Sequence, residues 1–62
     1  MMSKLRALRQ ARNLTQAELA KLLDVDRTTV TQWEIGKNLP RAGTLIKLSR
    51  ILKCDVDTLL RV

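Results

Sequence analysis

The sequence has no histidine, phenylalanine or tyrosine, and it has only one cysteine, one tryptophan, one proline and two glycines. Without histidine the chain lacks the commonest general base and the commonest protein ligand of zinc. Its single cysteine, Cys54, excludes a disulfide within the chain, which fits a reducing compartment. No nucleophile and base form a recognisable set. We therefore expect no metal, no cofactor and no enzymatic activity.

Long apolar runs are missing as well. No segment approaches the roughly 20 apolar residues that span a bilayer. The start of the chain, Met1-Met2-Ser3-Lys4, is not followed by an apolar stretch, so we do not expect a secretory signal there. Together with the cysteine content, these absences predict a cytoplasmic protein.

Aliphatic residues and positive charge are what the sequence does contain. Hydrophobic residues make up 45% of the 62 residues, which predicts a single folded domain, residues 1–62, with a small core. The 12 lysines and arginines outnumber the 6 aspartates and glutamates, giving a formal net charge of +6. Such charge favours a polyanionic partner, most commonly nucleic acid, although charge alone fits a merely soluble surface equally well.

The spacing of the apolar residues predicts an all-α, compact five-helix bundle. The expected helices cover residues 3–12, 15–23, 26–35 and 42–53, followed by a short helix that begins after Asp55. Ser3, Asp26 and Asp55 are expected to cap helix starts, and Thr15 with Glu18 has the pattern of a capping box. The apolar positions expected to face the core are Leu5, Leu8, Leu19, Ala20, Leu22, Leu23, Val30, Trp33, Leu45, Leu48, Leu52, Val56, Leu59 and Leu60.

The connection between the second and third helices is only Asp24-Val25-Asp26. So short a connection makes two helices cross steeply, which is the helix-turn-helix arrangement. The motif would cover about residues 16–35, and its second helix about residues 27–35.

The outward face of the third helix has an unusual composition. Val30 and Trp33 share the face directed at the core. The opposite face carries Thr28, Thr31, Gln32 and Ile35, with Arg27 at the helix start. Arginine, glutamine and threonine are side chains that read guanine, adenine and the thymine methyl group in the major groove. The alternative interpretation is an ordinary polar surface.

With these residues in place, the chain resembles the Cro/repressor (XRE-type) helix-turn-helix family from Leu5 to Leu60. The segments that carry the resemblance are Leu14-Thr15-Gln16-Ala17-Glu18-Leu19-Ala20, Trp33-Glu34-Ile35-Gly36-Lys37, Leu39-Pro40, Thr44-Leu45, Lys47-Leu48 and Val56-Asp57-Thr58-Leu59-Leu60. The resemblance implies a lambda-repressor-like DNA-binding domain, prokaryotic or phage-encoded, that regulates transcription by binding double-stranded DNA.

The resemblance also implies a role for individual residues. Base contacts would come from Arg27, Thr28, Thr31 and Gln32. Contacts with the DNA backbone would come from Gln16, Lys37, Asn38 and Arg41. Gln16 would lie at the start of the second helix, where free amides favour an anion. Arg9 would pair with Glu34 in a structural salt bridge that fixes the pose of the third helix.

Three positions depart from the family pattern. Asp24 and Lys53 stand where the family usually has glycine after a helix. Aspartate tolerates positive φ better than most residues, so we expect the turn at Asp24 to be kept, whereas Lys53 would be strained or would shift the helix end. Arg41 stands where the fourth helix usually has a capping residue, and Thr44 is the alternative cap.

The other conspicuous residues have simpler interpretations. Cys54 and Trp33 are expected in the core rather than in redox chemistry, metal binding or base stacking. The acidic pairs at positions 24/26 and 55/57 are explained by helix starts and turns. Ile46 is expected to be exposed and available to a second copy of the chain, Ile51 to be semi-buried, and Val62 is not assigned a place.

The function favoured by these observations is sequence-specific DNA binding, with repression preferred over activation. We expect a homodimer formed through the fourth and fifth helices on a pseudo-palindromic operator, with its two third helices roughly 34 Å apart. The alternative is a protein-interaction module such as an antitoxin or co-regulator. A basic amphipathic peptide at residues 47–53 that lies on membranes is disfavoured, because its leucines are needed for the core.

Overall fold

The computed structural model describes residues 4–60 of the chain. Its elements are α1 (Leu5–Ala11), α2 (Gln16–Leu23), α3 (Arg27–Glu34), α4 (Ala42–Leu52) and α5 (Val56–Leu60). These five helices, with no β-strand among the described residues, confirm the predicted all-α fold. Ser3, at which a helix cap was predicted, and Val62 lie outside the described residues.

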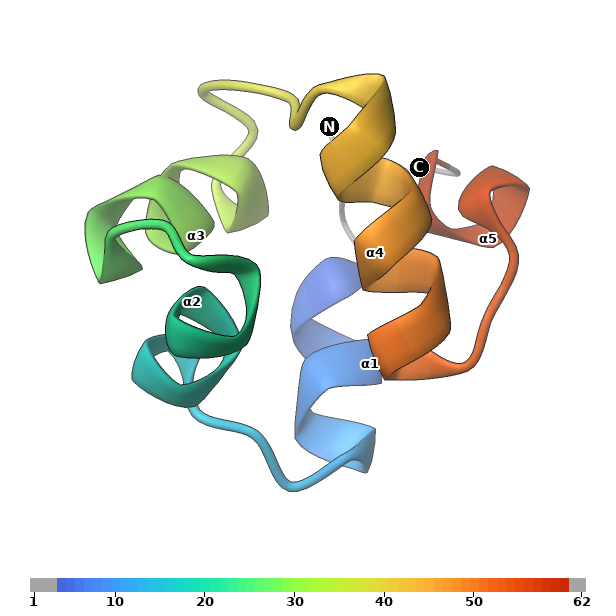
Figure 1. Cartoon of the computed structure of the whole chain (residues 1–62), viewed down its shortest axis with the longest axis horizontal. Helices are drawn as coiled ribbons and strands as arrows, with labels where there is room; N and C mark the ends of the chain where they lie inside the picture. The colour runs from blue at the N-terminus through green and yellow to red at the C-terminus, as the bar shows by residue number, and fades with distance from the viewer. Residues whose placement is uncertain (1–3, 61–62) are drawn as a thin grey trace.

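The helices form a globule of 23 × 23 × 20 Å. Figure 1 shows α2 and α3 together at one side, α5 at the opposite side, and α4, the longest helix, between them. The contacts between helices are most extensive between α2 and α3 and then between α4 and α5. The helix-turn-helix unit is therefore one edge of the molecule, and α1 and α4 support it from behind.

Four helices end with a residue in the left-handed conformation, in the arrangement called a Schellman motif. The left-handed residues are Asn13, Asp24, Gly36 and Lys53, with φ values of 56°, 57°, 81° and 53°. The hydrogen bonds that close the motifs are Leu14 N to Arg9 O, Val25 N to Ala20 O, Lys37 N to Gln32 O and Cys54 N to Ser49 O. The expectation that Asp24 keeps the turn is confirmed, and Lys53 carries strain without displacing the helix end.

The helix starts agree only partly with the sequence-based predictions. The capping box is confirmed, because Glu18 N donates to Thr15 Oγ1 over 3.0 Å and Thr15 N donates to Glu18 Oε1 over 2.9 Å. Asp26 occupies the capping position of α3, but its side chain makes no capping hydrogen bond. The proposed alternative cap Thr44 is wrong, because α4 begins at Ala42 after an extended Arg41.

Every helix contributes at least one buried residue to the core. Its buried members are Leu5, Leu19, Ala20, Leu23, Val30, Trp33, Leu48, Leu52 and Leu59. Leu22 was expected among them, but it is 58% exposed. The buried face of α2 is centred on Leu19, Ala20 and Leu23, and at 100° per residue Leu22 points about 100° away from that centre.

Several other side chains lie at intermediate depth. Leu8, Leu45, Ile51 and Cys54 are half-buried and pack against the core. Ile46 is exposed as expected, and Leu60 on α5 is exposed although it was expected to face the core.

Burial raises the pKa of the Cys54 thiol, with a smaller contribution from Asp55. No helix among residues 4–60 is both long enough and apolar enough to cross a membrane.

Candidate nucleic-acid interface

The helix α3 is fixed to the rest of the domain by one face. Val30 is fully buried on this face and Trp33 is 4% exposed. At its start, α3 follows α2 directly after the left-handed residue Asp24 and the half-buried Val25. The other face of α3 is thereby presented outward at the edge of the molecule (Figure 1).

The four predicted base-reading residues occupy this outward face at two levels. Arg27 and Thr28 are the first two residues of α3, are exposed, and make no side-chain hydrogen bond within residues 4–60. Thr31 and Gln32 lie one turn later and are half-buried. The exposed pair is free to meet a ligand, whereas the second pair is already held by neighbouring side chains.

A buried ion pair secures the end of α3. Arg9 Nε on α1 donates to Glu34 Oε2 over 2.7 Å, and Arg9 Nη2 donates to Glu34 Oε1 over 3.3 Å. A third nitrogen of the same guanidinium, Nη1, donates to the carbonyl oxygen of Leu14 over 2.8 Å. The structure therefore brings together the two residues that were expected to fix the pose of the third helix.

Gln16 extends this polar network to the outward face. Its Nε2 donates to Glu34 Oε1 over 3.1 Å, and its Oε1 accepts from the hydroxyl of Thr31 over 3.0 Å. Only one of the two hydrogens on Nε2 is used by Glu34, so the other remains for a further acceptor. Sequence reasoning missed the links from Gln16 to Glu34 and Thr31, because no spacing rule connects residues in different helices.

The turn after α3 folds back over Gln32. Gly36 adopts a φ of 81°, which glycine reaches without steric cost. Lys37 N then donates to the backbone oxygen of Gln32 over 2.9 Å, and Asn38 Nδ2 donates to Gln32 Oε1 over 2.7 Å. Asn38 therefore lies beside a predicted base-reading residue. This side-chain contact had no signal in the sequence, because it depends on the direction of the turn.

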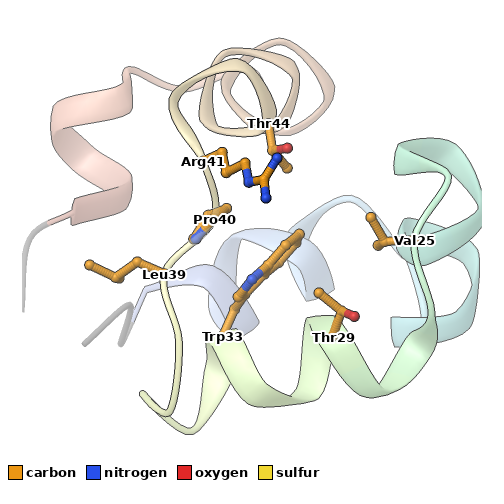
Figure 2. Close-up of a pocket in the computed structure, with 7 residues that line it drawn as sticks. All are labelled: Val25, Thr29, Trp33, Leu39, Pro40, Arg41 and Thr44. Carbon is orange, nitrogen blue, oxygen red and sulfur yellow. The ribbon is translucent and has the colours of Figure 1, made fainter.

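A groove of about 370 Å³ separates α3 from the start of α4. Its lining residues are Val25, Thr29, Trp33, Leu39, Pro40, Arg41 and Thr44. Figure 2 shows the Trp33 ring rising from α3 towards the start of α4, with Arg41 and Thr44 beyond it. Arg41 is exposed and immediately precedes α4. No side chain among the described residues caps the start of α4, so the positive charge of Arg41 adds to the free backbone N–H groups there.

Positive charges predominate on this surface, although Asp26, immediately before α3, is also exposed. Arg27, Lys37 and Arg41 are exposed, whereas the carboxylate of Glu34 is neutralised by Arg9. The site thus combines cations that suit a phosphate backbone with neutral hydrogen-bonding side chains that suit base edges. Other exposed lysines and arginines lie on α1, α2 and α4, so the net charge is not confined to this surface.

Comparison with known proteins agrees with this geometry. A model of the helix-turn-helix family matches residues 5–59. The HTH-type transcriptional activator BcrR of Enterococcus faecalis is 42% identical over 57 residues, which cover 92% of this chain and 28% of that relative. The Repressor protein C2 of Salmonella phage P22 is 34% identical over 58 residues, covering 94% of this chain and 27% of that relative.

A third relative is the HTH-type transcriptional regulator DicA of Escherichia coli strain K12. It is 42% identical over 41 residues, which cover 66% of this chain and 30% of DicA. The chain spans less than a third of the length of each of these three proteins. By its match over nearly all of the described residues and by its five-helix fold, the chain belongs to the Cro/repressor (XRE-type) helix-turn-helix family.

Proposed function

We propose that this domain binds double-stranded DNA sequence-specifically as the DNA-reading part of a transcriptional regulator. The observation that carries the proposal is the outward face of α3, where Arg27 and Thr28 are exposed at the helix start and Gln32 follows one turn later. The major groove is about 12 Å wide and admits an α-helix. Because α3 is anchored by its opposite face, it enters the groove as a rigid element.

The base edges are read by Arg27, Thr28, Thr31 and Gln32. The guanidinium of Arg27 has no hydrogen-bond partner among the described residues and can form two parallel hydrogen bonds with guanine. The hydroxyl hydrogen of Thr31 is taken up within the protein, by Gln16 Oε1 or the backbone oxygen of Arg27, so Thr31 contributes its methyl group and a hydroxyl lone pair. Thr28 is exposed and offers both its methyl and its hydroxyl group.

The DNA backbone is held on both sides of α3. Gln16 offers its remaining amide hydrogen at the start of α2, where the helix dipole favours an anion. Lys37, Asn38 and Arg41 follow α3 and are exposed. Contacts of this kind set the register of the protein on DNA without reading its sequence.

The second part of the proposal is a two-fold dimer on a pseudo-palindromic operator. The helices α4 and α5 pack against each other, and each leaves a large aliphatic side chain exposed, Ile46 at 48% and Leu60 at 43%. Two copies joined through these helices would place their α3 helices one turn of DNA apart, roughly 34 Å. A dimer seated across a promoter would act as a repressor by excluding polymerase.

The test is the selection of bound duplexes from a randomised DNA pool at near-physiological salt. The protein is compared with the double variant Arg27→Ala/Gln32→Ala. The matched control is Arg6→Ala/Gln10→Ala, which removes the same two residue types from exposed positions on α1. We expect a two-fold symmetric motif with the unchanged protein and the control, and loss of that motif with the α3 variant.

The same selection experiment can also contradict the proposal. Salt-sensitive binding to all duplexes without enrichment of any sequence would contradict sequence-specific recognition. A second candidate would then apply, a protein-interaction module, which the 58% exposed Leu22 on α2 favours.

A further inference from the structure

The side chains of Gln32 and Asn38 form one linked pair of amides. Asn38 Nδ2 donates to Gln32 Oε1 over 2.7 Å, the shortest distance between two neutral side chains in the described part of the chain. The backbone reinforces the contact, because Lys37 N donates to Gln32 O over 2.9 Å and Asn38 N to the same oxygen over 3.5 Å. The Schellman turn at Gly36 therefore places Asn38 in contact with Gln32.

This contact distinguishes the two ends of the Gln32 amide. Its oxygen is occupied by Asn38, whereas its nitrogen, Nε2, makes no hydrogen bond within residues 4–60. Gln32 is half-buried, whereas Asn38 and the hydrogen bond between the two amides are exposed. Reversing the Gln32 amide alone would place its Nε2 against the Nδ2 of Asn38, two donors facing each other, so the contact persists only if Asn38 reverses with it.

The orientation of the amide matters for base recognition. The usual pairing of glutamine with adenine requires the amide oxygen to accept from N6 while the amide nitrogen donates to N7. An oxygen that already accepts a short hydrogen bond is a weaker second acceptor. Both hydrogens on Nε2 remain, and they suit edges that present acceptors: guanine with O6 and N7, and thymine with O4.

We propose that Asn38 is a positioning residue that fixes the Gln32 amide, so that Gln32 donates through Nε2 to a keto base, guanine or thymine, in preference to adenine. This rests on the proposed DNA-binding function and gives Asn38 a part in specificity beyond a contact with the DNA backbone. Cytosine is excluded by the same argument, since its major-groove edge presents a donor to the donor of Gln32.

The experiment first locates the base that Gln32 reads. Selection from a randomised pool with the unchanged protein and with Gln32→Ala identifies the position at which preference disappears. Duplexes with each of the four bases at that position are then titrated with the unchanged protein, Asn38→Ala and Asn38→Asp. Thermal unfolding of all the variants confirms that each is folded at the temperature of the titration.

Asn38→Asp is the decisive variant. Its carboxylate only accepts hydrogen bonds, so Gln32 must turn Nε2 towards it and present Oε1 to the DNA. We expect the preference to change by about tenfold, from guanine or thymine to adenine or cytosine, whose edges offer an amino group. With Asn38→Ala the amide is free to rotate, and adenine should be accepted nearly as well as the keto bases.

Three results would contradict this inference, and they can be distinguished from one another. If both variants weaken binding equally for all four bases, Asn38 acts only as a backbone contact and the inference is wrong. The same holds if the unchanged protein prefers adenine at that position. If no sequence is selected at all, the proposed function itself fails, and this inference fails with it.

Discussion

The guanidinium of Arg9 and the carboxylate of Glu34 meet at 2.7 Å across 25 residues of sequence, and each side chain is more than nine-tenths buried. The pair connects the last turn of α1 to the last residue of α3. Glu34 also accepts from Gln16, so one carboxylate joins three helices. The orientation of α3 is therefore set by polar contacts as well as by the packing of Val30 and Trp33.

Replacing Arg9 with alanine should destabilise the fold strongly. The change leaves the Glu34 carboxylate buried without its cation, which typically costs about 3–5 kcal/mol. The exposed Lys37 has no comparable partner, so Lys37→Ala should leave the free energy of unfolding nearly unchanged. Thermal and urea unfolding of the two variants measures the difference. Identical melting temperatures would contradict a structural role for the ion pair.

A double variant separates the charge from the packing. In Arg9→Ala/Glu34→Ala the unpaired carboxylate is absent, so the loss of stability should be smaller than the sum of the two single changes. A sum that is simply additive would mean that the two side chains do not interact in solution.

The left-handed residue Lys53 predicts a stabilising substitution. A side chain with a β-carbon costs about 1–2 kcal/mol in this conformation, and Lys53 has a φ of 53°. Glycine avoids this cost in the folded state. Part of the resulting stabilisation is offset because glycine is more flexible in the unfolded chain. Lys53→Gly should therefore raise the free energy of unfolding by about 0.5–1 kcal/mol, or a few degrees in melting temperature.

The control is Lys53→Ala, which removes the charge but keeps the β-carbon. It should give no gain, so the difference between the two variants isolates the cost of the left-handed conformation. Asp24→Gly should give a smaller gain than Lys53→Gly, because aspartate adopts this conformation more readily. A larger gain at Asp24 would show that the strain at Lys53 is relieved by other contacts.

The capping box predicts a dependence of stability on pH. The Thr15 N–H group that donates to Glu18 lowers the pKa of this carboxyl group from its ordinary value of 4.5. A carboxyl group with a lowered pKa in the folded state stabilises the fold above its ordinary pKa and loses that contribution as the pH falls through the folded value. Glu18→Gln should thus melt below the unchanged protein at pH 7, and the gap should close on acidification.

Melting temperatures of both proteins from pH 7 down to pH 3 test this expectation. The other carboxyl groups are common to the two proteins, so their effects cancel in the difference. A gap that stays constant over the whole range would show that the Glu18 charge does not contribute through the capping box.

The helices and most of the core could be predicted from the sequence, because both follow from periodicity along one chain segment. The capping box at Thr15 and the left-handed Asp24 are local features, and both were predicted. Leu22 was misplaced for a related reason: its spacing fits an apolar stripe, but the actual width of the buried face depends on which neighbours pack against α2. That information is not local.

The candidate site was predictable in its residues but not in its contacts. The outward position of Thr28 and Gln32 follows from helical geometry, whereas the pairing of Arg9 with Glu34 was expected only from the family resemblance. The hydrogen bonds from Thr31 to Gln16 and from Asn38 to Gln32 join residues 15 and 6 positions apart, in different elements. They require the crossing of α2 with α3 and the turn at Gly36, which only the folded chain supplies.

A last prediction concerns how Lys37 contributes to binding. Lys37 is exposed, follows α3 directly and lies outside the base-reading face. If it contacts a phosphate, Lys37→Ala should weaken binding to all sequences by a similar factor and reduce the slope of log K against log salt by about 1. The matched control is Lys53→Ala, at the opposite end of α4 from Arg41. A fall in affinity confined to one base position would instead make Lys37 a base-reading residue, and an unchanged slope in both variants would remove it from the interface.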